Sequence, residues 1–283
     1  MGEGIGFEQP ETVENKGIAD ELGRVLESVP PKENYPPDRE LQRSILDQLP
    51  ENLVEELHAH LIVVEGGKEA ESSAEESKLR GELFERLATA QYGRAEAGTQ
   101  DPRLAEELSQ ELVQLMHDPR RFGLEEQIGG IRNPDLAFFK INDQGKVEIE
   151  AAGEVKLGLL TPRAAHQIGG GFREGTRKMV EVVNRMEKPE DSGLLAVAQS
   201  RTRGGYLSAS ENLKVKLIVP ADRNPEKVKS LVNRGIFPRE DYVRLLELLK
   251  NKDEVEILKS AFSRQEVAAM ADHLIGKIRE RYK

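Results

Sequence analysis

Three charged side chains stand in two apolar segments near the middle of the chain. Asp135 opens the segment "DLAFFKI", and Glu154 and Lys156 stand two residues apart in "KVEIEAAGEVKL". Two carboxylates that converge on one point repel each other and raise each other's pKa unless a cation lies between them. Such oxygen ligands suit Mg²⁺ or Mn²⁺, and a neighbouring lysine can orient a metal-bound water or offset charge on a reacting phosphate. These residue types therefore indicate cleavage of a phosphodiester bond.

This chemistry requires the two segments to be neighbouring strands. The intervening "NDQG" has the Asn, Asp and Gly residues typical of a tight turn, which predicts a hairpin. Asp135 then lies on the strand next to Glu154 and Lys156, although the sequence leaves the pairing register open. Strict alternation along the second strand assigns its residues to two faces. The face with the two functional candidates holds Glu148, Glu150, Glu154 and Lys156, and the face toward the core holds Val147, Ile149, Ala151, Val155 and Leu157.

Other patterns predict the elements around this hairpin. Residues 77–93 carry an apolar helical stripe, and a second helix is expected at 102–118. A longer helix is expected at about 162–186, weakened by the glycines at 169–171, which can also let the backbone approach a phosphate. Further apolar runs predict strands at 124–128, 193–200 and 213–220.

The same patterns divide the chain into three parts. Residues 1–76 form an acidic segment, partly disordered or helical, with a short helix near 18–26 and helical spacing at 38–64. It is either a solvated tail or a regulatory, partner-binding segment. Residues 77–220 form the core, and residues 221–283 form a helical extension. Its helices are expected to start at Asn224, at Arg239 and after the capping-box pattern at Ser263.

Composition limits the classes of function. The chain has 283 residues, no cysteine, 37% hydrophobic and 33% charged residues. The absence of cysteine excludes a disulfide framework and a thiolate site. No run is long enough for a membrane span or has the form of a signal peptide, so a cytoplasmic location is expected. The net charge of −10 is concentrated in residues 1–80, which hold 19 acidic and 8 basic side chains. The acidity of the whole chain therefore does not exclude a phosphate-binding face in the remaining residues.

The motif "PD" at residues 134–135 and "EVK" at residues 154–156 resemble the signature of the PD-(D/E)XK nuclease superfamily. The predicted order of helix, three strands, helix and strand is also similar to the core of that superfamily. "GE" at residues 81–82 resembles the first helix of its Holliday-junction-resolvase and RecB-like members. The resemblance covers roughly residues 77–220. It implies an α/β protein with a mixed central sheet flanked by helices, that is, a restriction-endonuclease-like core.

The resemblance also implies roles for individual residues. Asp135 and Glu154 bind Mg²⁺ or Mn²⁺ with help from the Val155 carbonyl, while Lys156 positions water or stabilises the transition state. Glu82 holds a water or a second ion. The helix after the lysine contacts the nucleic-acid backbone through Gln167, Arg173, Arg177 and Lys178.

One basic loop is a further candidate for contact with nucleic acid, and this follows from its residues and not from the resemblance. Arg201 and Arg203 stand in "QSRTRGGYLS", which can follow a nucleic-acid backbone or form a solvated loop.

The sequence therefore predicts a metal-dependent nuclease that hydrolyses DNA phosphodiester bonds, a (deoxy)ribonuclease of the PD-(D/E)XK type. Whether it acts as an endonuclease or an exonuclease stays open. The alternative is a non-catalytic module on the same fold that binds nucleic acid or protein. DNA is the expected partner, and a protein partner is a second candidate through the acidic N-terminal segment. No membrane partner is expected, and a homodimer is left open.

Overall fold

The computed structural model describes residues 13–32, 35–50, 52–62, 72–92, 134–141, 147–184 and 207–282. The chain forms two compact units, one of residues 1–87 with 261–283 and one of residues 88–260. These divisions differ from the expected boundaries after residues 76 and 220. The C-terminal helix is not a separate extension, because its apolar side chains are buried in the same unit as the N-terminal helices.

The first unit is helical. Its helices are α1 (Val13–Ser28), α2 (Arg39–Leu46), α3 (Leu53–Ile62), most of α4 (Ser72–Tyr92) and α11 (Arg264–Arg281). Its core consists mainly of leucines at helical spacing, among them Leu22, Leu26, Leu53, Leu57, Leu79, Leu83 and Leu87. The stripe expected on residues 77–93 is confirmed. The helix expected at 18–26 extends further in both directions.

A buried polar network fixes the start of α11 in this unit. Ser263 and Glu266 form the expected capping box, in which the Ser263 backbone N–H donates to Glu266 Oε2 at 2.8 Å. Glu266 is only 3% exposed, and its carboxylate also accepts from Arg39 Nη1 at 2.6 Å and from Gln42 Nε2 at 3.2 Å. A buried carboxylate must be paired in this way, since its desolvation is costly. The network therefore ties α11 to α2.

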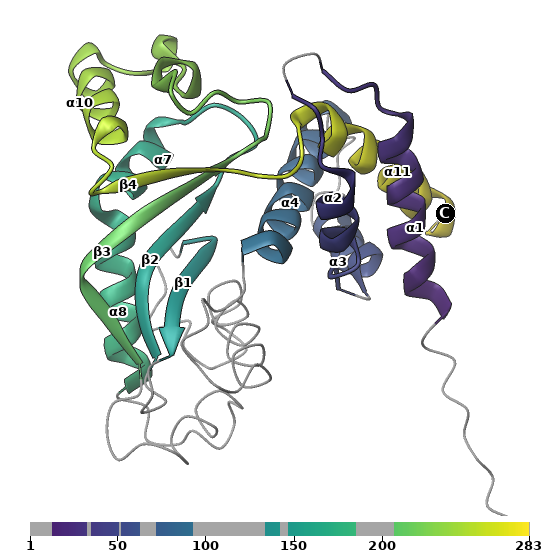
Figure 1. Ribbon diagram of the computed structural model, residues 1–283, viewed down its shortest axis with the longest axis horizontal. Helices are drawn as coiled ribbons and strands as arrows, with labels where there is room; N and C mark the ends of the chain where they lie inside the picture. The colour runs from purple at the N-terminus through teal and green to yellow at the C-terminus, as the bar shows by residue number, and fades with distance from the viewer. Residues whose placement is uncertain are drawn as a thin grey trace, which may run out of the picture. The chain divides into compact units, whose positions relative to one another are not determined.

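The second unit contains a four-stranded mixed sheet with the order β1-β2-β3-β4 (Figure 1). Its strands are β1 (Leu136–Ile141), β2 (Val147–Val155), β3 (Leu207–Val219) and β4 (Val255–Lys259). β1 pairs antiparallel with β2, and the other two pairings are parallel. The expected hairpin strands and the expected α/β class with a mixed sheet are confirmed.

Helices cover one face of this sheet. They are α7 (Pro162–His166), the π-helical turn η2 (Gln167–Gly171), α8 (Phe172–Asn184) and α10 (Arg239–Lys250). Figure 1 shows α8 running beside β3. The buried core between them includes Ala152, Ile168, Phe172, Val215, Leu217 and Leu245. The helix expected at 162–186 is thus present, and it is interrupted at Gly170, whose φ of +156° is a conformation that favours glycine.

The C-terminal part differs from the expectation in two ways: one expected helix is absent, and one strand was not expected. The helix expected at Asn224 is absent, because the Asn224 side chain accepts from the Glu226 backbone N–H and forms a turn, followed by the 3₁₀ turns η4 (Val228–Leu231) and η5 (Arg234–Ile236). The strand β4 was not expected at all. It has only five residues and, within the ranges that the structure describes, pairs with β3 alone, so its sequence pattern is too short to distinguish it from a loop. The helix predicted at 239–250 is confirmed.

Several predicted elements lie outside the described residues. They are the helix at 102–118, the strands at 124–128 and 193–200, and the turn between β1 and β2. Among the helices that the structure describes, none combines the length and apolar composition needed to cross a membrane.

Gly153 permits the close packing of β1 against β2, and this generates a first prediction. A Cβ atom at this position would lie 2.8 Å from Leu136 Cβ and 3.0 Å from Phe138 Cε2. Gly153→Ala should therefore lower the free energy of unfolding by roughly 1–3 kcal/mol in urea denaturation, the usual cost of overpacking. Gly158→Ala is the control, because a methyl group added there would meet nothing within 4 Å. Equal stability of the two variants would contradict this packing.

Candidate active site

The β1–β2 hairpin places Asp135 directly beside the end of β2. The Asp135 backbone N–H donates to the Gly153 carbonyl at 2.9 Å, which continues the ladder by one residue before β1. Its side chain turns back to the partner strand, where Oδ2 accepts from the Val155 backbone N–H at 2.7 Å. Both bonds fix the position of this carboxylate. The expected neighbourhood of Asp135 and Glu154 is therefore present in the structure.

A β-bulge decides which side chains share the face of the sheet with Glu154. Phe138 pairs with Ala151, but Phe139 pairs with Ile149, so Glu150 is an extra residue in β2. An extra residue reverses the alternation on its two sides. Glu148, opposite Lys140, therefore lies on the other face from Glu154.

The strict alternation assumed from the sequence is thus wrong at this point. Glu148 and Glu150 both pair with the exposed Lys140, at 3.4 and 2.5 Å. They form a solvated ion cluster of a kind that contributes little to stability. Only Glu154 and Lys156 remain as β2 candidates for the site.

Glu154 is buried while its partner Lys156 reaches solvent. The Glu154 side chain is 2% exposed, that of Lys156 is 31% exposed, and Lys156 Nζ lies 2.6 Å from Glu154 Oε1. The backbone N–H of Lys156 donates to the Ile218 carbonyl at 3.0 Å, so the lysine starts from a strand position anchored on β3. The site therefore has an inner carboxylate and an outer ammonium group.

The environment of Glu154 favours its protonated form. Burial raises the pKa of its carboxyl group, and the negative charge of Asp135 raises it further, against the opposing effect of Lys156. The result is a pKa of about 7. A hydrogen bond between the Glu154 and Asp135 carboxyl groups also raises the pKa, because it needs a proton between them. The site thus brings two carboxyl groups and one ammonium group together at the end of β2.

The donor atoms fit a small divalent cation. Mg²⁺ is commonly held by one or two carboxylates and several waters. Asp135 and Glu154 supply the carboxylates. The N–H of Val155 points toward Asp135, and in an extended strand the carbonyl of the same residue points to the same edge. Among the described residues no group of three or more His, Asp or Glu side chains could hold an ion, so the remaining ligands would be this carbonyl and water.

Glu82 belongs to the helical unit and has a partner there. Its carboxylate lies 3.4 Å from Arg86 Nη2, one turn further along α4, and Arg86 also pairs with Glu56 on α3 at 3.1 Å. These ion pairs explain the position of Glu82 within its own unit. Its predicted role beside Asp135 and Glu154 stays a prediction.

The predicted nucleic-acid contacts on α8 divide into two kinds. Arg173 Nε donates to the Leu213 carbonyl at 2.9 Å and its Nη1 lies 3.2 Å from Glu254 Oε2. Arg177 Nη2 donates to the Glu211 carbonyl at 3.1 Å. Both arginines thus hold α8 against β3, and Arg173 also links it to the turn before β4.

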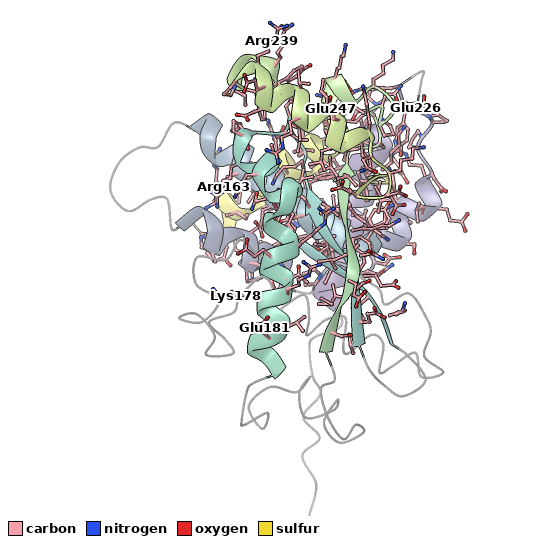
Figure 2. All side chains as sticks on the ribbon, turned by 90° about the vertical axis from the view of Figure 1, so that its left-hand side faces the viewer. Arg163, Lys178, Glu181, Glu226, Arg239 and Glu247 are labelled. Carbon is pink, nitrogen blue, oxygen red and sulfur yellow. The ribbon has the colours of Figure 1, made fainter. Side chains whose placement is uncertain are left out.

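The other predicted contacts are placed differently. Lys178 is exposed and lies on the lower half of α8 with Glu181 (Figure 2). Gln167 is half-buried at the start of η2. Arg201 and Arg203 lie outside the described residues. Lys178 is therefore the α8 residue best placed to meet a phosphate.

The sequence reasoning missed a pocket in the same unit, between η2 and α10. Asp241 and Arg244 of α10 line it, together with His166 and the three glycines at 169–171. The only signal for it in the sequence was the glycine run, because the packing of α10 on η2 depends on tertiary structure.

Comparison with known proteins assigns no family to this chain. No protein-family model, no curated protein and no solved structure matches it. Its function therefore has to be argued from the chemistry of its own residues.

The protonation of Glu154 generates a second prediction. Because the pKa of Glu154 is raised on folding, the folded state binds more protons than the unfolded state between pH 4.5 and about 7. The contribution of Glu154 to the free energy of unfolding therefore falls as the pH rises through this window. Glu154→Gln, which mimics the protonated form, should therefore gain stability relative to wild type between pH 5 and 8, by on the order of 2 kcal/mol. Urea denaturation without divalent ions measures this. Glu148→Gln is the control, and an equal change in both variants would refute the pKa shift.

Proposed function

We propose that this protein hydrolyses DNA phosphodiester bonds with the help of Mg²⁺ or Mn²⁺. The observation that supports this most is the cluster of Asp135, Glu154 and Lys156 at the adjoining ends of β1 and β2, with Glu154 buried and Lys156 at the surface. The carboxyl groups of Asp135 and Glu154 lie within hydrogen-bonding reach of each other, and Lys156 pairs with Glu154. Two carboxylates that converge on one point suit a site that takes up a cation.

The arrangement of elements also supports a restriction-endonuclease-like core. An antiparallel hairpin, a helical segment and a further parallel strand follow one another as β1, β2, α7 to α8, and β3. Asp135 and Glu154, which match the motif, lie at the adjoining ends of β1 and β2. The proposal therefore includes membership in the PD-(D/E)XK type.

Each residue of the cluster has a defined part in the proposed reaction. Asp135 and Glu154 bind the ion through their carboxylates, with the Val155 carbonyl as a third ligand. When bound, the ion supplies Lewis-acid chemistry at a phosphate oxygen. Lys156 orients the attacking water or stabilises negative charge that develops on the phosphate. Glu154 has to lose its proton before it can serve as a ligand, so activity should rise with pH toward and above 7.

The DNA backbone would meet the exposed part of the sheet unit. Lys178 supplies a cation on α8 for this contact, and Gln167 supplies an amide group at η2. Arg173 and Arg177 contribute indirectly, because they hold α8 in place against β3. Substitution of either arginine would therefore affect stability as well as binding.

Three variants of the cluster test the proposed reaction. Lys156→Ala keeps both carboxylates but removes the group that lowers the pKa of Glu154. At pH 8.5 and saturating Mn²⁺, metal and DNA binding should therefore persist while the cleavage rate falls by about 10² to 10³. Asp135→Asn keeps an acceptor for the Val155 N–H but removes a charged ligand, so added Mn²⁺ should partly restore its rate. Glu154→Gln should abolish cleavage at all Mn²⁺ concentrations that can be reached. The assay measures the cleavage rate of single-stranded, double-stranded and branched DNA against Mg²⁺ and Mn²⁺ concentration.

Lys140→Ala is the matched control for this series. Lys140 is also a sheet lysine with two carboxylate partners, but these are the partly exposed Glu148 and the bulge residue Glu150. It should cleave at the wild-type rate. If wild type and the three cluster variants cleave alike, the cluster is not catalytic. If DNA is bound but never cleaved, the chain is a binding module.

A further inference from the structure

A second site is formed by the pocket between α10 and the π-helical turn η2. Its volume is about 550 Å³, within the range of about 300–1,000 Å³ that is typical of small-molecule sites. Its apolar wall consists of Ala165, Phe237 and Leu248, which pack against the buried core of the sheet unit. This wall is therefore backed by closely packed side chains.

Another part of the pocket lining is glycine backbone. Gly169, Gly170 and Gly171 all border the pocket. A Cβ on Gly170 would meet nothing within 4 Å, and one on Gly169 would approach only Leu248, at 3.9 Å. The main chain is thus open to a bound molecule at Gly169 and Gly170, whereas a Cβ on Gly171 would lie 3.5 Å from the His166 carbonyl oxygen. π-Helical turns inside α-helices are frequent at functional sites.

Four charged or titratable side chains surround the pocket without pairing with one another. They are His166, Glu174, Asp241 and Arg244. In the described part of the chain, no hydrogen bond or ion pair involves any of these side chains. This differs from the arginines of α8, which bind carbonyls and Glu254. A ligand that carries both an anionic group and hydrogen-bond donors could engage both signs of charge.

We propose that this pocket binds a nucleoside monophosphate unit whose base carries an amino group. Arg244 and His166 would bind the phosphate, since a guanidinium group matches a phosphate with two parallel hydrogen bonds. The base would lie flat on Phe237 and the glycine backbone. The carboxylates of Asp241 and Glu174 would accept hydrogen bonds from the amino group of the base. Guanine fits best, because its adjacent N–H donors match the two oxygens of one carboxylate.

This site goes beyond the proposed cleavage reaction and is separate from it. None of the residues that line the pocket belongs to the cluster of Asp135, Glu154 and Lys156. Nucleotide binding can therefore be measured in metal-free buffer, where no cleavage is expected. The nucleotide has two sources, a free nucleotide or an unpaired nucleotide of a nucleic-acid strand.

Titration calorimetry of the whole protein tests the pocket, with guanosine monophosphate as the probe. Guanosine monophosphate should bind about tenfold more tightly than uridine monophosphate, which lacks the amino group, and more tightly than inorganic phosphate. Arg244→Gln should weaken binding by at least about tenfold, and Asp241→Asn should reduce the preference for guanine. Gly169→Ala adds one methyl group at the pocket wall without backbone strain, and it should also weaken binding.

Arg239→Gln and Glu247→Gln are the matched controls, because both residues lie on α10 outside the pocket lining (Figure 2). They should bind the probe as wild type does. An oligonucleotide with one unpaired guanosine distinguishes the two sources of the nucleotide. If it displaces guanosine monophosphate from the pocket, the pocket binds a nucleotide of a nucleic-acid strand. If it does not, the pocket binds the free nucleotide, and either result supports nucleotide binding. The proposal is overturned if no nucleotide binds at millimolar concentration, if phosphate binds as tightly as the nucleotide, or if the pocket variants bind like the controls.

Discussion

The confinement of two carboxylates and one ammonium group at the adjoining ends of β1 and β2 is the constraint on which the functional account depends. Burial of Glu154 beside Asp135 is unfavourable in water-free surroundings unless a proton or a cation compensates it. The hairpin register enforces this proximity through the two hydrogen bonds between Asp135 and the backbone of β2. Asp135 therefore both satisfies a backbone N–H of β2 and brings a second carboxyl group next to Glu154.

Other features of the sheet unit follow from this arrangement. The bulge at Glu150 separates the solvated charges at one end of β2 from the buried charge at the other end. Gly153, just before Glu154, leaves room for Leu136 and Phe138 and so lets β1 lie close. Arg173 links α8 to β3 and to Glu254, next to the edge strand. Together these contacts give the cluster a rigid support, which is what preorganised electrostatic stabilisation requires.

Local signals made much of the fold predictable. The capping box at Ser263 predicted the start of α11, and the apolar periodicity predicted the helices at 77–93 and 239–250. The turn residues between two apolar runs predicted the hairpin, and with it the proximity of Asp135 and Glu154. Each of these signals acts over a few residues. Residue type and hairpin geometry were therefore sufficient to find the carboxylate cluster.

Features that depend on distant contacts were not predictable. The bulge at Glu150 is set by pairing with both β1 and β3, so strict alternation misplaced Glu148. β4 is a five-residue edge strand that exists because β3 offers it a partner. Arg173 and Arg177 stay predicted nucleic-acid contacts, but their bonds to carbonyls of β3 were not predictable, because these partners lie more than 30 positions away in sequence. The pocket beside η2 likewise arises from the packing of α10.

The number of protons released when Mn²⁺ binds tests the central claim most directly. If Asp135 and Glu154 form the metal site and Glu154 has a pKa of about 7, binding must displace the proton that the two carboxylates share. Calorimetry in buffers of different ionisation enthalpy should then show one Mn²⁺ bound per chain, with about one proton released at pH 6 and almost none at pH 8.5. Glu154→Gln should lose both the binding and the proton release. Mn²⁺ binding with no proton release at either pH, or with release that Glu154→Gln retains, would contradict the account.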